Sequence, residues 1–238
     1  MEIKDFFGRI YAINLPSRRD RRRMIVRELN KAVMPLESSK VQIFPGIQPN
    51  NAGDFPSIGV KGCFLSHLAI LKQVKNDGLA NVLIVEDDLT ISKQFKTEQE
   101  LLVAQLCQTD WGFVYFGHIE EEPAEASSVK LRPFFKPLMT AHFYAVNSKI
   151  LDRLISFLEE LQQRPGGHPD GGPMHLDGAY STFRVQNPDV VTLIASPNLG
   201  WQRSSRSDIS PKLLDRTPIL NQLVGIMRIF KALLYTRR

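Results

Sequence analysis

The length and composition of the chain indicate one folded domain with a short tail. It has 238 residues, of which 43% are hydrophobic and 23% are charged, and these shares exclude disordered and fibrous classes of protein. A formal net charge of +5 leaves nucleic acid, an anionic membrane or a phosphorylated substrate open as partners. The two cysteines, Cys63 and Cys107, cannot build a disulfide framework and match no metal-ligand spacing such as C-x-x-C.

Targeting signals are not recognisable in the sequence. Residues 1–5 lack the basic start and the apolar run of a secretory signal. No uncharged apolar stretch reaches the roughly 18 residues that a membrane-spanning helix needs. We therefore expect a cytoplasmic catalytic domain over residues 1–215, followed by a C-terminal helix over 216–238.

Predicted strands and helices alternate along the chain. An apolar run at 10–15 predicts the first strand, and Ser17 with Asp20 has the form of a capping box that opens a helix. Four consecutive apolar residues at 82–85 are typical of a strand buried on both faces. Further strands are predicted at 41–47, 111–116, 138–146 and 190–195, and helices at 61–75, 95–108 and 148–162. This alternation predicts an α/β fold with a mainly parallel central sheet and helices on both faces, in which ligands bind at the carboxyl ends of the strands.

Three adjacent carboxylates, Glu86, Asp87 and Asp88, end the strand that begins at Asn81. They would repel one another unless a cation or several donors compensated them, and a hard divalent ion that bridges a diphosphate would do so. Side chains alternate in an extended chain, so Glu86 and Asp88 are expected on one face and Asp87 elsewhere. An acidic strand end that caps the next helix is the alternative, and the shape of the motif leaves both open.

The segment 61–67 enters a predicted helix just before that strand. Gly62 permits a close backbone approach near a helix N-terminus, where anionic groups are favoured. A single histidine on a mostly apolar face, such as His67, is more often a core residue than a ligand. Cys63 is likewise more often a packing residue.

The two segments together carry a resemblance to a known family. The sequence Gly59-Val-Lys-Gly62-Cys63-Phe-Leu-Ser66-His67, followed by Leu-Ile-Val-Glu-Asp-Asp, resembles glycosyltransferase family 25. That family includes bacterial lipooligosaccharide galactosyltransferases and the related collagen galactosyltransferases. The resemblance is close over residues 9–89 and thinner afterwards. It implies a GT-A type nucleotide-diphospho-sugar transferase fold, a UDP-hexose donor, most commonly UDP-galactose, transfer with inversion, and a divalent ion, Mn²⁺ or Mg²⁺, near the acidic triplet.

The resemblance also implies which residues form the site. Glu86 and Asp88 would hold the ion. Asn14 and Arg21 would lie near the nucleotide end of the sheet. The residues implied to bind or support the donor are Asn14, Arg21, Gly62, Ser66, His67, Glu86 and Gln202.

An inverting transfer needs a base for the acceptor hydroxyl. Asp177 is the candidate, because it follows the Gly- and Pro-rich loop 165–173, which could meet the acceptor. Asp87 and Asp208 are its rivals, and a helix cap before Ala179 is the alternative role of Asp177. The loop departs from the pattern of the family and leaves the identity of the acceptor open.

The tail has its own pattern. Over residues 219–235 apolar side chains recur at helical spacing and polar or basic ones occupy the other sides. Such a helix can lie in an anionic membrane surface, which would suit a lipid-linked glycan or glycolipid acceptor and a peripheral position on the inner face of the membrane. Packing of this helix on the core is the alternative.

A hexosyl transfer to a glycan, lipid-linked or part of a cell-surface polysaccharide, is therefore the predicted function. A nucleotidyltransferase ranks lower, because residues 14–17 after the first strand hold no glycine for a triphosphate loop. A non-catalytic glycan- or membrane-binding module on a transferase fold is the rival from another class. Nucleic acid is not expected as a partner, since the arginines at 18–23 have no aromatic-rich binding motif beside them.

Overall fold

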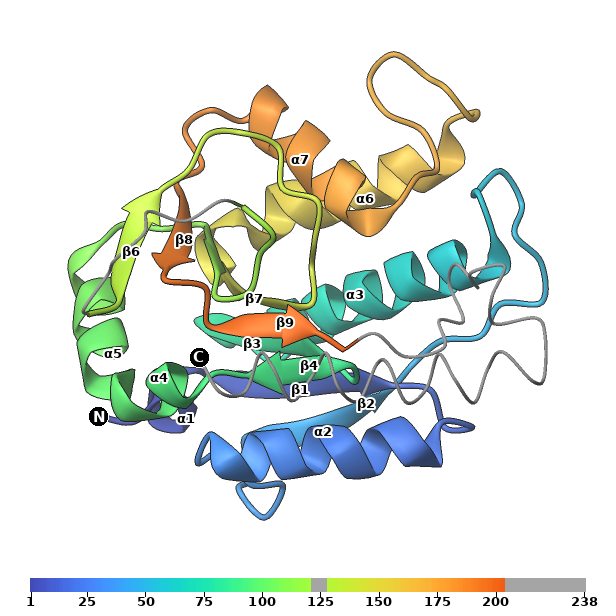
Figure 1. Ribbon diagram of the computed structural model, residues 1–238. Helices are drawn as coiled ribbons and strands as arrows, with labels where there is room; N and C mark the ends of the chain where they lie inside the picture. Colours follow the sequence, from blue (N-terminus) through green and yellow to red (C-terminus); the bar gives the residue numbers. More distant parts are fainter. Residues whose placement is uncertain (121–127, 204–238) are drawn as a thin grey trace.

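A seven-stranded sheet forms the centre of the computed structural model, which describes residues 1–120 and 128–203 (Figure 1). The strand order is β2-β1-β3-β7-β5-β8-β6. The strands are β1 (Arg9–Asn14), β2 (Val41–Pro45), β3 (Asn81–Glu86), β5 (Phe113–Tyr115), β6 (Lys130–Pro133), β7 (Phe143–Asn147) and β8 (Thr192–Ser196). Five of them run in one direction, and β6 and β7 run against the others. The predicted α/β class with a mainly parallel sheet is confirmed.

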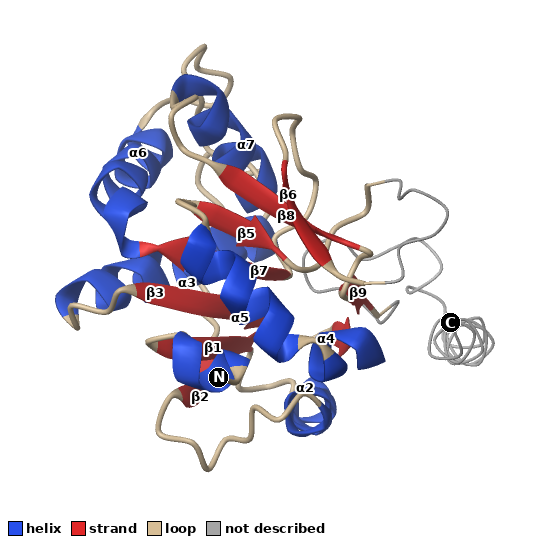
Figure 2. Cartoon of the chain, turned by 90° about the vertical axis from the view of Figure 1, so that its left-hand side faces the viewer, coloured by secondary structure: helices blue, strands red, loops and turns tan. Residues whose placement is uncertain are grey.

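Helices cover both faces of this sheet (Figure 2). One face carries α1 (Ile3–Phe6), α2 (Arg19–Lys31), α4 (Lys93–Thr97) and α5 (Gln99–Gln108), and the other carries α3 (Ile58–Asn76), α6 (Leu151–Gln163) and α7 (Leu176–Gln186). Strand β3 shows why two cores form: Val82 and Ile84 belong to one, and Leu83 and Val85 to the other. All four side chains are fully buried, as the continuous apolar run predicts.

The helix α3 is anchored at both ends by local sequence. Ser57 caps its N-terminus, because the Ser57 hydroxyl oxygen accepts a hydrogen bond from the Val60 N–H at 3.1 Å. The helix ends at Asn76, and Gly78 then turns the chain with a φ of +64°. This short turn delivers the chain directly into β3.

A second, two-stranded sheet joins distant parts of the sequence. It pairs β4 (Leu89–Ile91) with β9 (Gly200–Gln202), and Leu89 lies opposite Gln202. The pairing brings the end of the described chain back to the turn that follows β3.

Several local predictions were wrong. Ser17 does not cap α2: the helix begins at Arg19 with Arg18 at the cap position, and Asp20 forms an ion pair with the Arg18 side chain at 3.1 Å. The helix predicted at 95–108 is two helices, α4 and α5. They separate at Glu98, whose carboxylate accepts a hydrogen bond from the Val129 N–H at 2.7 Å and so holds the start of β6.

The helices α1 and α7 and the short strands β4, β6 and β9 were not predicted as elements. The tail helix 216–238 and Asp208 lie outside the described residues, so their structure stays a prediction. Within the described ranges, none of the helices is long and apolar enough to cross a membrane.

Candidate active site

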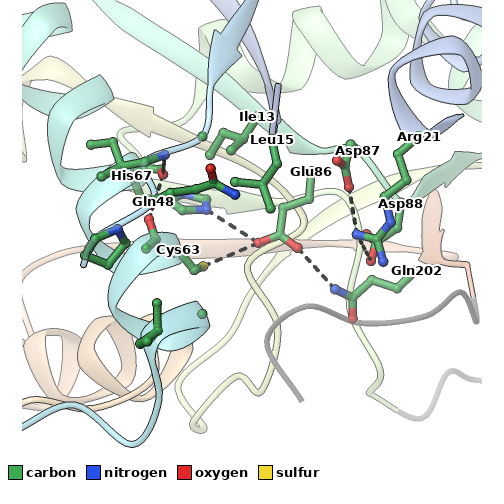
Figure 3. A pocket seen from close by; sticks show the side chains of 17 residues that line it. Ile13, Leu15, Arg21, Gln48, Cys63, His67, Glu86, Asp87, Asp88 and Gln202 are labelled. Atoms are coloured by element: carbon green, nitrogen blue, oxygen red, sulfur yellow. Dashed lines mark hydrogen bonds and ion pairs between the residues drawn. The ribbon is translucent and has the colours of Figure 1, made fainter. Parts of the chain in front are cut away.

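A cavity of about 420 Å³ opens where β1, β2 and β3 end (Figure 3). This is the edge at which open α/β sheets bind ligands. The wall combines apolar and ionisable side chains with backbone from the first turns of α3. The lining residues are Ile13, Leu15, Arg21, Gly46, Ile47, Gln48, Pro49, Ile58, Gly59, Gly62, Cys63, Ser66, His67, Glu86, Asp87, Asp88 and Gln202.

Glu86, the last residue of β3, lies at the centre of this wall. Its Oε1 is 3.5 Å from His67 Nε2 and 3.8 Å from Cys63 Sγ. Its Oε2 accepts a hydrogen bond from the Gln202 amide at 3.3 Å. Burial on its own would raise the pKa of Glu86, but the contact with His67 holds that pKa below its ordinary value. Glu86 is therefore ionised at neutral pH.

Asp87 turns away from Glu86 and is held by two donors. The Asn14 amide donates to Asp87 Oδ2 at 2.7 Å, and Arg21 Nη1 donates to Oδ1 at 2.9 Å. Both oxygens are thereby used inside the protein. Asn14 itself does not line the cavity but contacts Asp87, which does, and its predicted part in donor binding stays a prediction. The arrangement favours a structural role for Asp87 over that of a base.

Asp88 has a carboxylate oxygen that accepts no hydrogen bond from the described residues. Its Oδ2 lies 3.8 Å from Arg21 Nη1, whereas its buried Oδ1 has no hydrogen-bond partner in the described structure. Burial, together with the charges of Glu86 and Asp87, raises the pKa of Asp88 to about 7. Glu86 and Asp88 were expected on one face of a strand, but Asp88 does not belong to the strand. The strand ends at Glu86, residues 87–88 form a turn, and all three residues line the cavity.

Arg203 holds this turn from a distant part of the chain. Its guanidinium donates to the carbonyl oxygens of Leu89 at 2.6 Å and Asp87 at 2.7 Å. Its backbone N–H donates to the carbonyl oxygen of Asp88 at 2.7 Å. These three bonds fix the backbone of the acidic turn without neutralising a carboxylate directly.

Gly62 and Ser66 explain how α3 approaches the loop after β2. A Cβ on Gly62 would lie 2.6 Å from the Ile47 carbonyl oxygen, so a larger residue could not sit there without a shift of backbone. Ser66 Oγ donates to the Gly62 carbonyl oxygen at 2.6 Å and accepts from the Ile47 N–H at 2.8 Å. Both residues line the cavity, and their predicted part in donor binding stays a prediction.

His67 connects the cavity to the protein interior. It is fully buried, and its Nδ1 lies 2.7 Å from the Tyr144 hydroxyl, which in turn lies 2.9 Å from the Tyr180 hydroxyl. The interpretation of His67 as a core histidine is correct for its burial, yet its Nε2 faces Glu86. No sequence pattern indicated that Tyr144 and Tyr180 contact His67. They lie in β7 and α7, which are far from α3 in the sequence and meet His67 only in the folded chain.

Two sets of side chains could hold a metal ion. Glu86 and Asp88 provide oxygen ligands, and the unpartnered Asp88 oxygen fits a hard divalent ion. Cys63, His67 and Glu86 form a second set, with ligand atoms that all lie within 4.8 Å of one another. Burial and the nearby charge of Glu86 raise the pKa of the Cys63 thiol well above its ordinary value, so without a cation the thiol is neutral.

Asp177 lies in the first turn of α7, outside the cavity wall as described. The cap position belongs to His175, so the alternative role of Asp177 as a helix cap was wrong. Asp177 Oδ1 accepts a hydrogen bond from the adjacent Gly178 N–H at 2.8 Å. Its negative charge is one of the causes that raise the pKa of the Cys63 thiol. Its role as a base stays a prediction.

The structure thus brings most of the predicted residues together. Arg21, Gly62, Ser66, His67, Glu86, Asp87, Asp88 and Gln202 all line one cavity. Cys63 was given a packing role and proves to be part of the wall. Its spacing of four residues from His67, one helical turn, was the available signal. Arg203 appeared in the sequence only as one of several basic residues.

Comparisons with known proteins bear on the family of the chain. The model of glycosyltransferase family 25, described as LPS biosynthesis protein, matches residues 7–161. Procollagen galactosyltransferase 2 of Homo sapiens is 29% identical over 200 residues, which are 76% of this chain and 31% of that protein. Inactive glycosyltransferase 25 family member 3 of Homo sapiens is 30% identical over 145 residues, 53% of this chain and 24% of that protein. The chain therefore spans less than a third of the length of these relatives.

One solved structure supports the fold. The structure of a glycosyltransferase involved in the glycosylation of the major capsid of PBCV-1 superposes with a TM-score of 0.51 at 11% sequence identity. The superposition covers 83% of this chain and 93% of that one. At this level of identity the likeness concerns the fold, and it confirms the predicted GT-A type.

Proposed function

The chain belongs to glycosyltransferase family 25, and we propose that it transfers a hexose from a UDP-sugar to a hydroxyl group of a glycan. The proposed donor site is the cavity at the ends of β1, β2 and β3. Galactose is the proposed sugar, because a relative that matches 76% of the chain is a procollagen galactosyltransferase. The acceptor is proposed to be a glycan, lipid-linked or part of a surface polysaccharide, in keeping with the description of the family as an LPS biosynthesis protein.

The single observation that carries this proposal is the buried Asp88 Oδ1, which has no hydrogen-bond partner among the described residues. A buried carboxylate oxygen without a hydrogen-bond partner is costly unless a cation or a donor satisfies it. Asp88 lies beside Glu86 in a cavity that is large enough for a small ligand. A site for a divalent ion and the diphosphate of a nucleotide-sugar would satisfy this oxygen.

Glu86 and Asp88 are the residues that would hold the ion, which is proposed to be Mn²⁺ or Mg²⁺ because the ligands are hard oxygens. When bound, such an ion would neutralise charge on the diphosphate leaving group. Arg21, which lines the same cavity, contributes a fixed positive charge beside Asp87 and Asp88. The N-terminal end of α3, with Gly59 and Gly62 in the wall, adds a positive helix dipole that favours an anionic ligand.

The acceptor side of the reaction is proposed to lie toward α7. Inversion at the sugar carbon requires a base that takes the proton of the attacking hydroxyl. Asp177 is the candidate that the described structure offers, because both oxygens of Asp87 are already used by Asn14 and Arg21. The loop 165–173 leads into α7, so its Gly and Pro residues are proposed to shape the acceptor site. A tail helix that lies on an anionic membrane would bring a glycolipid acceptor to this side.

The test is a calorimetric titration of UDP and UDP-galactose into the purified chain, with and without Mn²⁺. We expect binding that depends on Mn²⁺ in the native chain and in the control Asp110→Asn, a carboxylate whose side chain is 91% exposed. Asp88→Ala should lose the Mn²⁺-dependent part of the binding while its thermal unfolding still shows a folded protein. A folded native chain that binds neither ligand with Mn²⁺ present would refute the donor site.

A second candidate function has one observation in its favour. A human relative that is 30% identical over 145 residues is an inactive family member, and this supports a non-catalytic module as the second candidate. Release of UDP from UDP-galactose separates the two candidates. Binding without release, with water or with any glycan offered as acceptor, would support the non-catalytic module.

A further inference from the structure

The side chains of Cys63, His67 and Glu86 converge in the wall of the cavity (Figure 3). Cys63 and His67 lie one turn apart on α3 and present their side chains to the same side. Glu86 reaches them from the end of β3, the strand that follows α3 in the chain. A sulfur atom, an imidazole nitrogen and a carboxylate oxygen are therefore held by two rigid elements of the core.

The distances between these atoms fit a tetrahedral metal centre. Glu86 Oε1 lies 3.8 Å from Cys63 Sγ and 3.5 Å from His67 Nε2, and all three ligand atoms lie within 4.8 Å of one another. In tetrahedral zinc sites with bonds of about 2.0–2.3 Å, neighbouring ligand atoms are about 3.3–3.8 Å apart. Small changes of side-chain torsion would close the remaining gap.

The state of His67 is a second, independent observation. Its ring is fully buried, and its Nε2 has no hydrogen-bond partner although it points at the other two ligands. Its Nδ1 is held by the Tyr144 hydroxyl at 2.7 Å, and Tyr144 is held by Tyr180 at 2.9 Å. Histidines that bind metal are typically oriented in this way by a partner on the other ring nitrogen.

We propose that Cys63, His67 and Glu86 form a zinc site whose fourth ligand position opens on the cavity. The set of donors separates this site from the one proposed for Mn²⁺ or Mg²⁺, because sulfur and imidazole ligands favour zinc whereas carboxylates alone favour the harder ions. On binding, Zn²⁺ takes the place of the thiol proton, which leaves to solvent. The site uses one residue, Glu86, that the donor site also uses.

The experiment uses the full chain and Zn²⁺ alone, in competition with a chromophoric chelator of known affinity. We expect one bound zinc per chain in the native protein and in Cys107→Ser, since Cys107 is the other, exposed cysteine. Cys63→Ser should weaken zinc binding by more than the 10–100-fold that the loss of an outer partner typically costs. With Co²⁺ in place of Zn²⁺, the thiolate-to-cobalt absorption band should be present in Cys107→Ser and absent in Cys63→Ser.

Two further variants test the geometry. His67→Gln should weaken zinc as strongly as Cys63→Ser. Tyr144→Phe keeps the ring but removes the hydroxyl that orients His67, and it should weaken zinc by about 10–100-fold. Thermal unfolding of each variant shows whether it is folded. Zinc binding that is absent from the folded native chain, or that survives Cys63→Ser unchanged, would overturn the site, and so would equal losses in Cys63→Ser and Cys107→Ser.

The effect of zinc on UDP binding is a separate arm that rests on the proposed function. Because Glu86 would serve both ions, saturating Zn²⁺ should lower the affinity for UDP measured with Mn²⁺, and Cys63→Ser should remove this effect. A chain that binds zinc but no UDP would keep the zinc site and refute the donor site. A chain that binds UDP but no zinc would keep the donor site and refute the zinc site.

Discussion

The first 91 residues and residues 113–203 build the same sheet, but they contribute very differently to the cavity. The first part supplies the adjacent parallel strands β2, β1 and β3 and, among the described residues, every one that lines the cavity except Gln202. The second part supplies the mixed strands β7, β5, β8 and β6 and packs two helices against α3. Parallel strands end at one edge, so consecutive β-α units place their loops together, whereas the antiparallel β7 interrupts that edge. The proposed donor chemistry is thus concentrated in the first part.

The second part acts on the cavity mainly through residues that do not line it. Tyr144 and Tyr180 support His67, and Arg203 holds the backbone of the turn that carries Asp87 and Asp88. Residues that do not line the cavity thus hold residues that do. This division predicts that changes in the first part affect donor binding, and that changes in the second part affect acceptor chemistry or positioning.

Asp177→Asn should have the largest effect and tests whether the second part supplies chemistry. If Asp177 is the base, the variant should lower kcat for UDP release from UDP-galactose, with water as acceptor, by about 10²–10⁴-fold. The affinity for UDP should not change, because Asp177 lies outside the described cavity wall. The control is Asp170→Asn in the preceding exposed loop, with a side chain that is 69% exposed. An unchanged kcat in Asp177→Asn would assign the base elsewhere, with Asp208 next in line.

Arg21→Met tests the ion pair between Arg21 in α2 and Asp87 after β3, both in the first part of the chain. Arg21 and Asp87 are 2.9 Å apart, with side chains only 12% and 9% exposed. Removal of one partner leaves a buried charge poorly compensated, so we expect the free energy of unfolding to fall by about 3–5 kcal/mol. Urea denaturation measures the loss. Arg22→Met, on the exposed side of the same helix, should change stability by less than about 0.5 kcal/mol, and equal losses in both variants would contradict the role of the pair.

The raised pKa of Asp88 predicts how stability depends on pH in the presence of a chelator. In the folded chain this pKa is about 7, against an ordinary value of 3.8, so the folded state holds the proton to higher pH than the unfolded state does. Ionised Asp88 therefore costs stability. The cost is absent below about pH 4, grows through the interval between the two pKa values and is complete above about pH 7.

Asp88→Asn removes that charge and makes the dependence measurable. The gain in free energy of unfolding over the native chain should be near zero at pH 4 and should rise by at most about 4 kcal/mol at pH 8, at about 1.4 kcal/mol per pKa unit. Denaturation at both pH values, with Asp110→Asn as the exposed control, checks this. A gain that is the same at pH 4 and pH 8 would show that Asp88 does not titrate in this range.

How much could be predicted from the sequence also differs between elements with a local pattern and positions set by distant residues. The strand that ends in Glu86 and the helix that carries His67 were predictable, because burial on both faces and a period of about 3.6 residues are local patterns. The positions of Asp87 and Asp88 were not, since they depend on where β3 ends and on donors 66 to 116 residues away in sequence. Strands of three or four residues, such as β4, β6 and β9, carry too few side chains to show a period. Each of them pairs with a strand far away in the sequence.

Gln202→Ala tests the direct contribution that the described residues of the second part make to the cavity, and its effect should be the smallest. Gln202 reaches Glu86 because β9 pairs with β4, and its amide donates to Glu86 Oε2 at 3.3 Å. A single neutral donor on an exposed side chain contributes about 0.5–1.5 kcal/mol, so UDP affinity measured with Mn²⁺ should change by about 2- to 12-fold. Thr90→Ala in the adjoining strand, where Thr90 pairs with Trp201 but does not line the cavity, is the matched control. A loss well beyond tenfold in Gln202→Ala alone would mean that the second part binds the donor directly, and the division between the two parts of the chain would have to be abandoned.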